Sequence, residues 1–113
     1  MSVDKKVLRQ EASERVSRHT DDLVSITQAL VRIPSVNPPG DYARMASKMK
    51  EFYRAEGLDP LVVQAPELEL ARLELSAPRP NVIALMRGKN EGPTFCLDAH
   101  MDVVDPGDET IWT

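Results

Sequence analysis

The sequence predicts an α/β fold in which helices pack on a mixed sheet. Between Thr20 and Glu56 the apolar residues recur at spacings of three and four, which is typical of helices. After Gly57 the pattern changes to short apolar runs, which are typical of strands. A chain of 113 residues with 42% hydrophobic residues is also large enough for one small globular domain.

Residues 1–19 are polar and charged with weak periodicity, so we assign them as an N-terminal extension, either helical or frayed. His19 within it is expected to be a solvated surface residue. A helix is expected over residues 20–32, because its apolar residues fall on one stripe and Thr20 is a suitable N-cap. It should end there, since Pro34 disfavours helical geometry in the residue before it.

A second helix is expected over residues 41–56, after a proline-rich connector at 35–40. The apolar residues on its one face are Tyr42, Met45, Met49, Phe52 and Tyr53. We interpret this methionine and aromatic stripe as part of the core. Gly57 is well placed to end the helix in a left-handed conformation.

Strands are expected at residues 58–64, 81–87 and 94–99. The last two are mostly apolar on both faces, as in the interior of a sheet covered by helices. Residues 65–80 mix helix and strand preferences between prolines, which indicates an irregular connection with some local structure. Cys96 lies in the third strand, and we expect it to be a buried core thiol rather than a catalytic one.

Composition narrows the class of function. The net charge is −4 and the basic residues are scattered, which argues against a basic face for nucleic acid. No apolar run approaches the roughly 20 residues that cross a bilayer, and no secretory signal is visible. A single cysteine suits a reducing compartment. We therefore expect a cytoplasmic protein that binds neither nucleic acid nor membrane.

The chemistry is concentrated at His100 and Asp102, at the end of the third predicted strand. Residues i and i+2 of an extended segment point to the same side. A metal-ligating histidine needs this arrangement, because a carboxylate on one ring nitrogen fixes the tautomer while the other nitrogen binds the metal. Sites also form at strand ends in open α/β sheets. The alternative is a satisfied surface pair, which the spacing alone does not exclude.

Three segments, the last of which contains His100 and Asp102, occur in order and are followed by Trp112. They read Leu-Val-Arg-Ile-Pro-Ser-Val-Asn-Pro-Pro-Gly (30–40), Asn-Val-Ile-Ala (81–84) and His-Met-Asp-Val-Val-Asp-Pro-Gly-Asp (100–108). Together they resemble the start of the acetylornithine deacetylase / succinyl-diaminopimelate desuccinylase family of zinc metallopeptidases and deacylases. The resemblance covers residues 20–113 and implies the N-terminal portion of a zinc-peptidase-like catalytic domain.

The resemblance also implies roles for individual residues. In that family the histidine of His-x-Asp binds one of two metal ions, usually zinc with cobalt as an alternative, so His100 is the implied metal ligand. Asp102 is the implied catalytic residue, which supports the histidine and the metal-bound water. The implied enzyme is a hydrolase that acts on the amide bond of a small N-acyl amino acid or peptide. A homodimer is an option for the full-length protein. Family members more often have proline at the turn position of Asp105.

The remaining residues that the family uses match no position in this sequence. They are a bridging aspartate, a general-base glutamate and further metal ligands, all of which lie further along in family members. We therefore expect residues 20–113 to be an incomplete hydrolase domain, an N-terminal fragment that is inactive alone. Two alternatives stay open: a non-catalytic binding or regulatory module, and a truncated product without independent function.

Overall fold

The computed structural model describes residues 4–112. The chain divides into two compact units, one that extends to Arg32 and one that begins at Ile33. Each unit is described here by itself. Within the described residues, no helix has both the length and the apolar character needed to cross a membrane.

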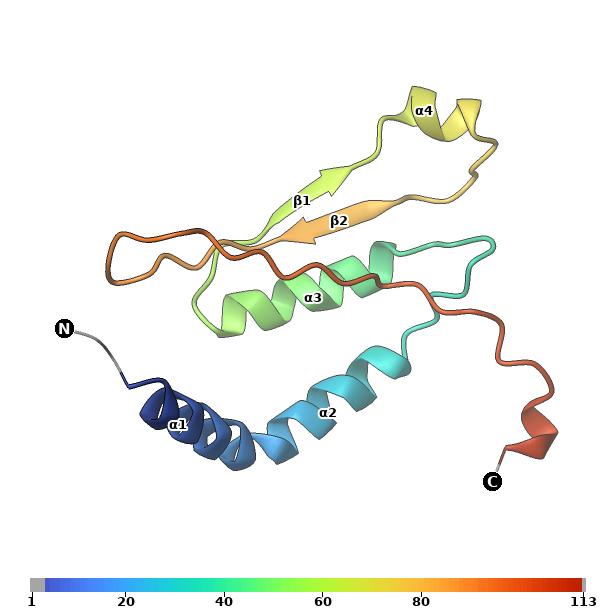
Figure 1. Ribbon diagram of the computed structural model, residues 1–113. Helices are drawn as coiled ribbons and strands as arrows, with labels where there is room; N and C mark the ends of the chain where they lie inside the picture. The colour runs from blue at the N-terminus through green and yellow to red at the C-terminus, as the bar shows by residue number, and fades with distance from the viewer. Residues whose placement is uncertain (1–3, 113) are drawn as a thin grey trace. The chain divides into compact units, whose positions relative to one another are not determined.

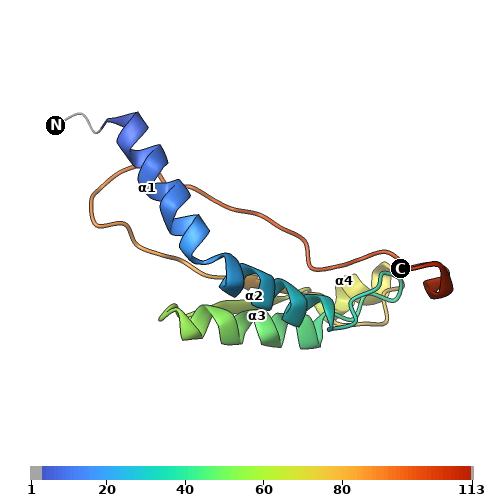
Figure 2. The same cartoon turned by 90° about the horizontal axis from the view of Figure 1, so that it is seen from below.

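The first unit consists of two consecutive helices, α1 (Lys5–Arg18) and α2 (Thr20–Val31). Figures 1 and 2 show a bend between them, at His19. α1 begins where the carboxylate of Asp4 accepts a hydrogen bond from the backbone N–H of Lys6 at 2.8 Å. Within the described residues the extension is helical over Lys5–Arg18, and the helix predicted over residues 20–32 is confirmed as α2.

The second unit contains the remaining elements. In chain order they are α3 (Ala43–Ala55), β1 (Leu61–Gln64), α4 (Glu67–Arg72), β2 (Pro80–Ile83) and the short 3₁₀ helix η1 (Glu109–Ile111). Figure 1 shows α3 alongside the two strands, and it packs against β2. The buried apolar residues of this unit include Tyr42, Met45 and Ala46, so the predicted core face of the second helix is confirmed at Tyr42 and Met45. Its other predicted members, Met49, Phe52 and Tyr53, are half-buried.

The sheet has two antiparallel strands in the described part of the chain. Leu61 pairs with Ile83 and Gln64 with Pro80. The connection between the strands carries α4, which agrees with the local structure expected there. α3 ends as predicted, because Gly57 adopts a left-handed conformation with φ of 76° and its N–H bonds to the carbonyl of Arg54 at 3.0 Å.

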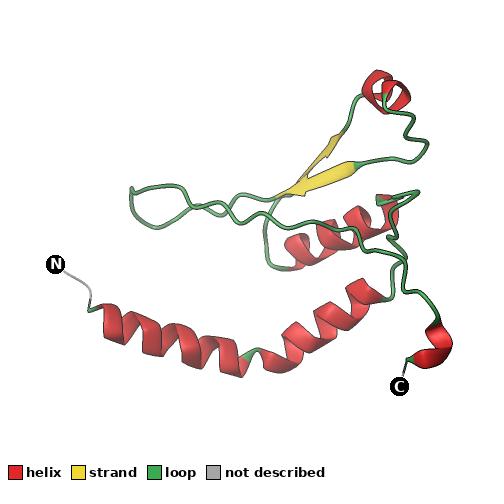
Figure 3. Ribbon diagram, turned by 45° about the vertical axis from the view of Figure 1, so that its right-hand side comes forward, coloured by secondary structure: helices red, strands yellow, loops and turns green. Residues whose placement is uncertain are grey.

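The strand predicted over residues 94–99 is wrong. Figure 3 shows this segment as a loop, and β2 also ends at Ile83 rather than at residue 87. The sheet is therefore antiparallel rather than mixed. A strand needs backbone hydrogen bonds to a neighbour, and residues 94–99 form none with the rest of residues 4–112. Its side chains face solvent: Phe95 is 83% and Leu97 87% exposed, and Cys96 is exposed instead of buried in a core.

Candidate functional site

The candidate site begins with a backbone contact between two distant segments. Val36, in the proline-rich connector, forms a parallel bridge with Val103. The N–H of Asn37 donates to the carbonyl of Val103 at 2.9 Å, and the N–H of Val103 donates to the carbonyl of Ser35 at 3.1 Å. Ser35 is only 2% exposed. The connector therefore lies directly beside the segment that carries His100 and Asp102.

The histidine and the aspartate meet as the sequence predicted. Nδ1 of His100 lies 2.9 Å from Oδ1 of Asp102 and 3.0 Å from the backbone carbonyl oxygen of the same residue. A backbone carbonyl oxygen only accepts hydrogen bonds, so Nδ1 carries the proton. In the neutral ring, Nε2 then holds the lone pair. The side chain of His100 is 85% exposed, which leaves Nε2 free to bind a ligand.

Asp102 is held from a second side by Asn37, which the sequence analysis did not select. Nδ2 of Asn37 donates to Oδ2 of Asp102 at 3.1 Å. This hydrogen bond, together with the one from His100, favours the ionised carboxylate and lowers the pKa of Asp102 below its ordinary value, against a smaller opposing effect of desolvation. The two carboxylate oxygens thus have different partners, one on each side.

Arg79 connects Asn37 to the core of the unit. Its Nη1 donates to the hydroxyl of Tyr42 at 2.9 Å, and its Nη2 donates to the carbonyl of Pro39 at 3.0 Å and, over 3.4 Å, to Oδ1 of Asn37. The guanidinium also lies over the ring of Tyr42, with 5.1 Å between Cζ and the ring centroid. Tyr42 is 8% exposed. Burial raises its pKa, and the charge of Arg79 partly offsets this.

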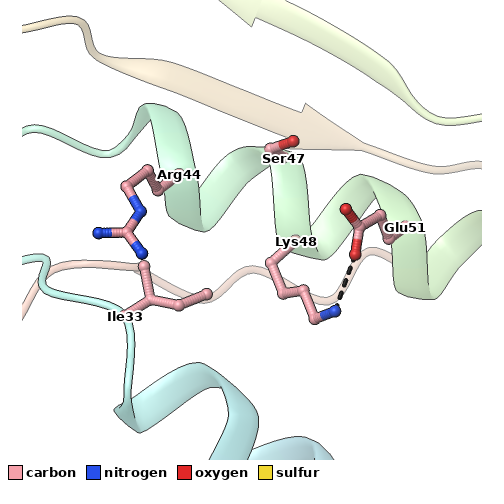
Figure 4. Close-up of a pocket in the computed structure, with 5 residues that line it drawn as sticks. All are labelled: Ile33, Arg44, Ser47, Lys48 and Glu51. Atoms are coloured by element: carbon pink, nitrogen blue, oxygen red, sulfur yellow. Dashed lines mark hydrogen bonds and ion pairs between the residues drawn. The ribbon is translucent and has the colours of Figure 1, made fainter.

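These groups surround a small pocket of about 270 Å³. It is lined by Tyr42, Arg79, Pro80, Asn81, Ala99, His100, Met101 and Asp102. A second hollow of similar volume lies against α3 and is shown in Figure 4. Its polar groups include the ion pair of Lys48 and Glu51, in which Nζ lies 2.8 Å from Oε2. No histidine lines this hollow. Of these two pockets, the first brings an imidazole and the half-buried guanidinium of Arg79 to one place.

Gly40 is needed where the connector passes Arg79. Its φ of 76° is unfavourable for residues with a side chain. A Cβ atom here would also lie 2.7 Å from Nη1 of Arg79 and 2.7 Å from the hydroxyl of Tyr42. The connector can therefore approach the guanidinium closely enough to offer the Pro39 carbonyl only because this residue is glycine.

The described residues fit one position of a metal site and do not complete one. His100 offers Nε2 with its tautomer fixed by Asp102, which is the arrangement of a metal-ligating histidine. A catalytic zinc normally has three protein ligands. Within residues 4–112, no three or more His, Cys, Asp and Glu side chains are grouped so as to hold a metal ion.

A pair of glycine variants separates backbone strain from the contact with Arg79. Gly40 and Gly57 share a φ of 76°, but a Cβ at Gly57 would meet nothing within 4 Å. Gly57→Ala should cost about 1–2 kcal/mol of unfolding free energy from strain alone. Gly40→Ala should cost about 1–3 kcal/mol more, because it also crowds the guanidinium. Urea unfolding of both variants measures the difference, and equal losses would contradict the close approach.

The pKa of Asp102 should respond to Asn37. Carbon NMR of the carboxyl groups should show a lowered pKa in the wild type that returns toward the ordinary value in Asn37→Ala. Because the folded-state pKa is lowered, the associated stability is present above the unfolded value of 3.8 and is lost as pH falls through the folded value. Asp108, whose pKa is lowered by Thr110, is the internal control and should not move. If the pKa of Asp102 were the same in Asn37→Ala as in the wild type, Asn37 would not be a functional part of the site.

The structure brings together both residues that the sequence selected, His100 and Asp102, and it adds Asn37, Tyr42 and Arg79. The only sequence signal for Asn37 is its place in the segment 30–40, on which the family resemblance partly rests. In comparisons with protein-family models, curated proteins and solved structures, nothing matched this chain.

Proposed function

We propose that this chain contributes a metal-binding histidine and its orienting carboxylate to a metal-dependent amide hydrolase. The substrate class is a small N-acyl amino acid or peptide. The further metal ligands and the general base come from polypeptide outside these 113 residues, so the chain alone is inactive. The free thiol of Cys96 suits a reducing compartment, and we place the protein in the cytoplasm.

The observation that carries the proposal is the position of the His100 ring against Asp102. Its Nδ1 is engaged by two oxygens of Asp102, which leaves Nε2 as the nitrogen that accepts a ligand. His19 provides a contrast, because its Nδ1 also lies 2.9 Å from a carboxylate, that of Asp22. That pair is a local i, i+3 contact at the start of a surface helix. Asp102, unlike Asp22, is fixed from a second segment of the chain.

His100 and Asp102 have separate tasks in the proposed reaction. His100 would hold the metal ion through Nε2, and Asp102 accepts a hydrogen bond from Nδ1–H and keeps the ring in this orientation. The hydrogen bonds from Asn37 and His100 favour the ionised carboxylate and lower the pKa of Asp102 further, so Asp102 is ionised at neutral pH and can accept a hydrogen bond from Nδ1–H of His100. When bound, the metal ion polarises the scissile carbonyl and makes water a better nucleophile.

Exposed apolar side chains support the placement of this chain within a larger domain. Several of them lie close to the site in sequence: Leu85, Met86, Phe95, Leu97, Val104 and Trp112 are each at least 64% exposed. Contiguous apolar surface is normally covered in a stable protein. Residues 94–99 also form no backbone hydrogen bonds within the part of the chain that the structure describes, so a further strand could pair with them. A larger catalytic domain would supply both the cover and the missing ligands.

The test compares the two histidines in protein expressed from the complete reading frame. His100→Ala should lose bound zinc and hydrolysis of N-acyl amino acids, because it deletes a bond to the metal. Asp102→Asn should lose about 10–100-fold in metal affinity or rate, as expected when the support of a ligand is weakened. His19→Ala should match the wild type in metal content and rate.

The 113-residue chain alone should hydrolyse the same substrates no faster than free zinc in buffer. Zinc content and turnover that survive His100→Ala would contradict the proposal. A protein that binds zinc through His100 but hydrolyses nothing would instead indicate a binding or regulatory module.

A further inference from the structure

We propose that Asn37 is a positioning residue that sets the tautomer of His100 through Asp102. It receives its own orientation from Arg79 and from the backbone pairing with Val103. The inference rests on the proposed function for its purpose, but its chemistry concerns this chain's own protons and needs no metal ion.

The first step is the orientation of the Asn37 amide. Arg79 has only donors, so the group that faces it must be the carbonyl Oδ1, which lies 3.4 Å from Nη2. The amide nitrogen Nδ2 then faces Asp102, which in its ionised form has only acceptors. A cation on one side and an anion on the other thus permit a single amide orientation. The reversed amide would direct donors at Arg79 and an oxygen at the carboxylate.

The second step is that the two oxygens of the Asp102 carboxylate have different hydrogen-bond donors. Asn37 donates to Oδ2 and His100 to Oδ1. A carboxylate held on one oxygen cannot rotate freely about its side-chain bonds. Its other oxygen therefore stays within 2.9 Å of Nδ1 of His100, and the Nδ1–H form of the ring is favoured.

The third step is the anchor of the network. Arg79 is fixed by Tyr42 and by the Pro39 carbonyl, at 2.9 and 3.0 Å. Its remaining Nε is buried and has no hydrogen-bond partner in the described part of the chain. Leaving a buried donor unsatisfied costs free energy. The other nitrogens of this guanidinium contact Tyr42 and the connector. An arginine that is held in this way despite an unsatisfied Nε is consistent with a positioning role rather than with a loose surface contact.

The experiment measures the histidine tautomers by ¹⁵N NMR of the 113-residue chain at about pH 9, where histidine side chains are neutral. In the wild type, His100 should be mainly the Nδ1–H form. Asn37→Asp keeps the shape and the acceptor for Arg79 but replaces the donor with a negative charge beside Asp102. The ratio of Nδ1–H to Nε2–H should fall about two- to tenfold, which is the equivalent of one net hydrogen bond.

Two controls separate positioning from general effects. Asn81→Asp places the same charge on another residue that lines the pocket, and it should leave the ratio for His100 unchanged. His19, observed in the same spectra, should not respond in any variant, because its partner Asp22 lies in the first turn of α2, which begins directly after His19. If Asn37→Asp fails to fold, Asn37→Ala removes the donor without adding charge and should lower the ratio in the same way.

The outcomes distinguish this inference from the proposed function. A folded Asn37 variant with an unchanged tautomer ratio overturns the positioning role, as does a wild type in which His100 is mainly the Nε2–H form. A shifted ratio in a protein whose complete reading frame binds no zinc overturns the proposed function and leaves the positioning role intact. If both hold, Asn37→Asp should also weaken zinc binding by about tenfold.

Discussion

The parallel pairing of Val36 with Val103 is the contact on which the rest of the site depends. Two backbone hydrogen bonds, of 2.9 and 3.1 Å, join segments that are 67 positions apart in the sequence. Neither His100 nor Asp102 lies in a helix or strand, so their own segment does not fix their position. The pairing fixes it from outside, by attaching the residue after Asp102 to a connector that is itself held by Arg79.

The polar groups of the site form an ordered series between a cation and an anion. Arg79 donates to Asn37, and Asn37 and His100 each donate to a different oxygen of Asp102. Each neutral group between the charges is used in one orientation only, because its partner is purely a donor or purely an acceptor. Each hydrogen bond of the series therefore has a defined donor and a defined acceptor. Nε2 of His100 remains as the exposed nitrogen base.

The sequence predicted those parts that depend on local chemistry. The helices follow from their apolar spacing and from Gly57, and the contact between His100 and Asp102 follows from the geometry of residues i and i+2. The strand over residues 94–99 was wrong because apolar and β-branched residues indicate a preference for extended structure but not the presence of a pairing partner. The prediction that Cys96 is buried was wrong for the same reason, because a segment without a pairing partner does not enter a core.

Asn37, Tyr42 and Arg79 were missed because their contacts span large separations in the sequence. Asn37 is 65 positions from Asp102, and Arg79 is 37 and 42 positions from Tyr42 and Asn37. No spacing rule connects such residues in a single sequence. The prolines and Gly40 of the connector indicated a rigid turn, but they did not indicate which side chain the turn would approach.

The central claim is that Nε2 of His100 binds a metal ion, and X-ray absorption at the zinc edge tests it most directly. In zinc-loaded protein from the complete reading frame, the spectrum should contain imidazole nitrogen at about 2.0–2.1 Å from the metal. His100→Ala should contain one imidazole fewer, while His19→Ala should reproduce the wild-type spectrum. If His100→Ala also gave the wild-type spectrum, the metal would be bound elsewhere and the claim would be wrong.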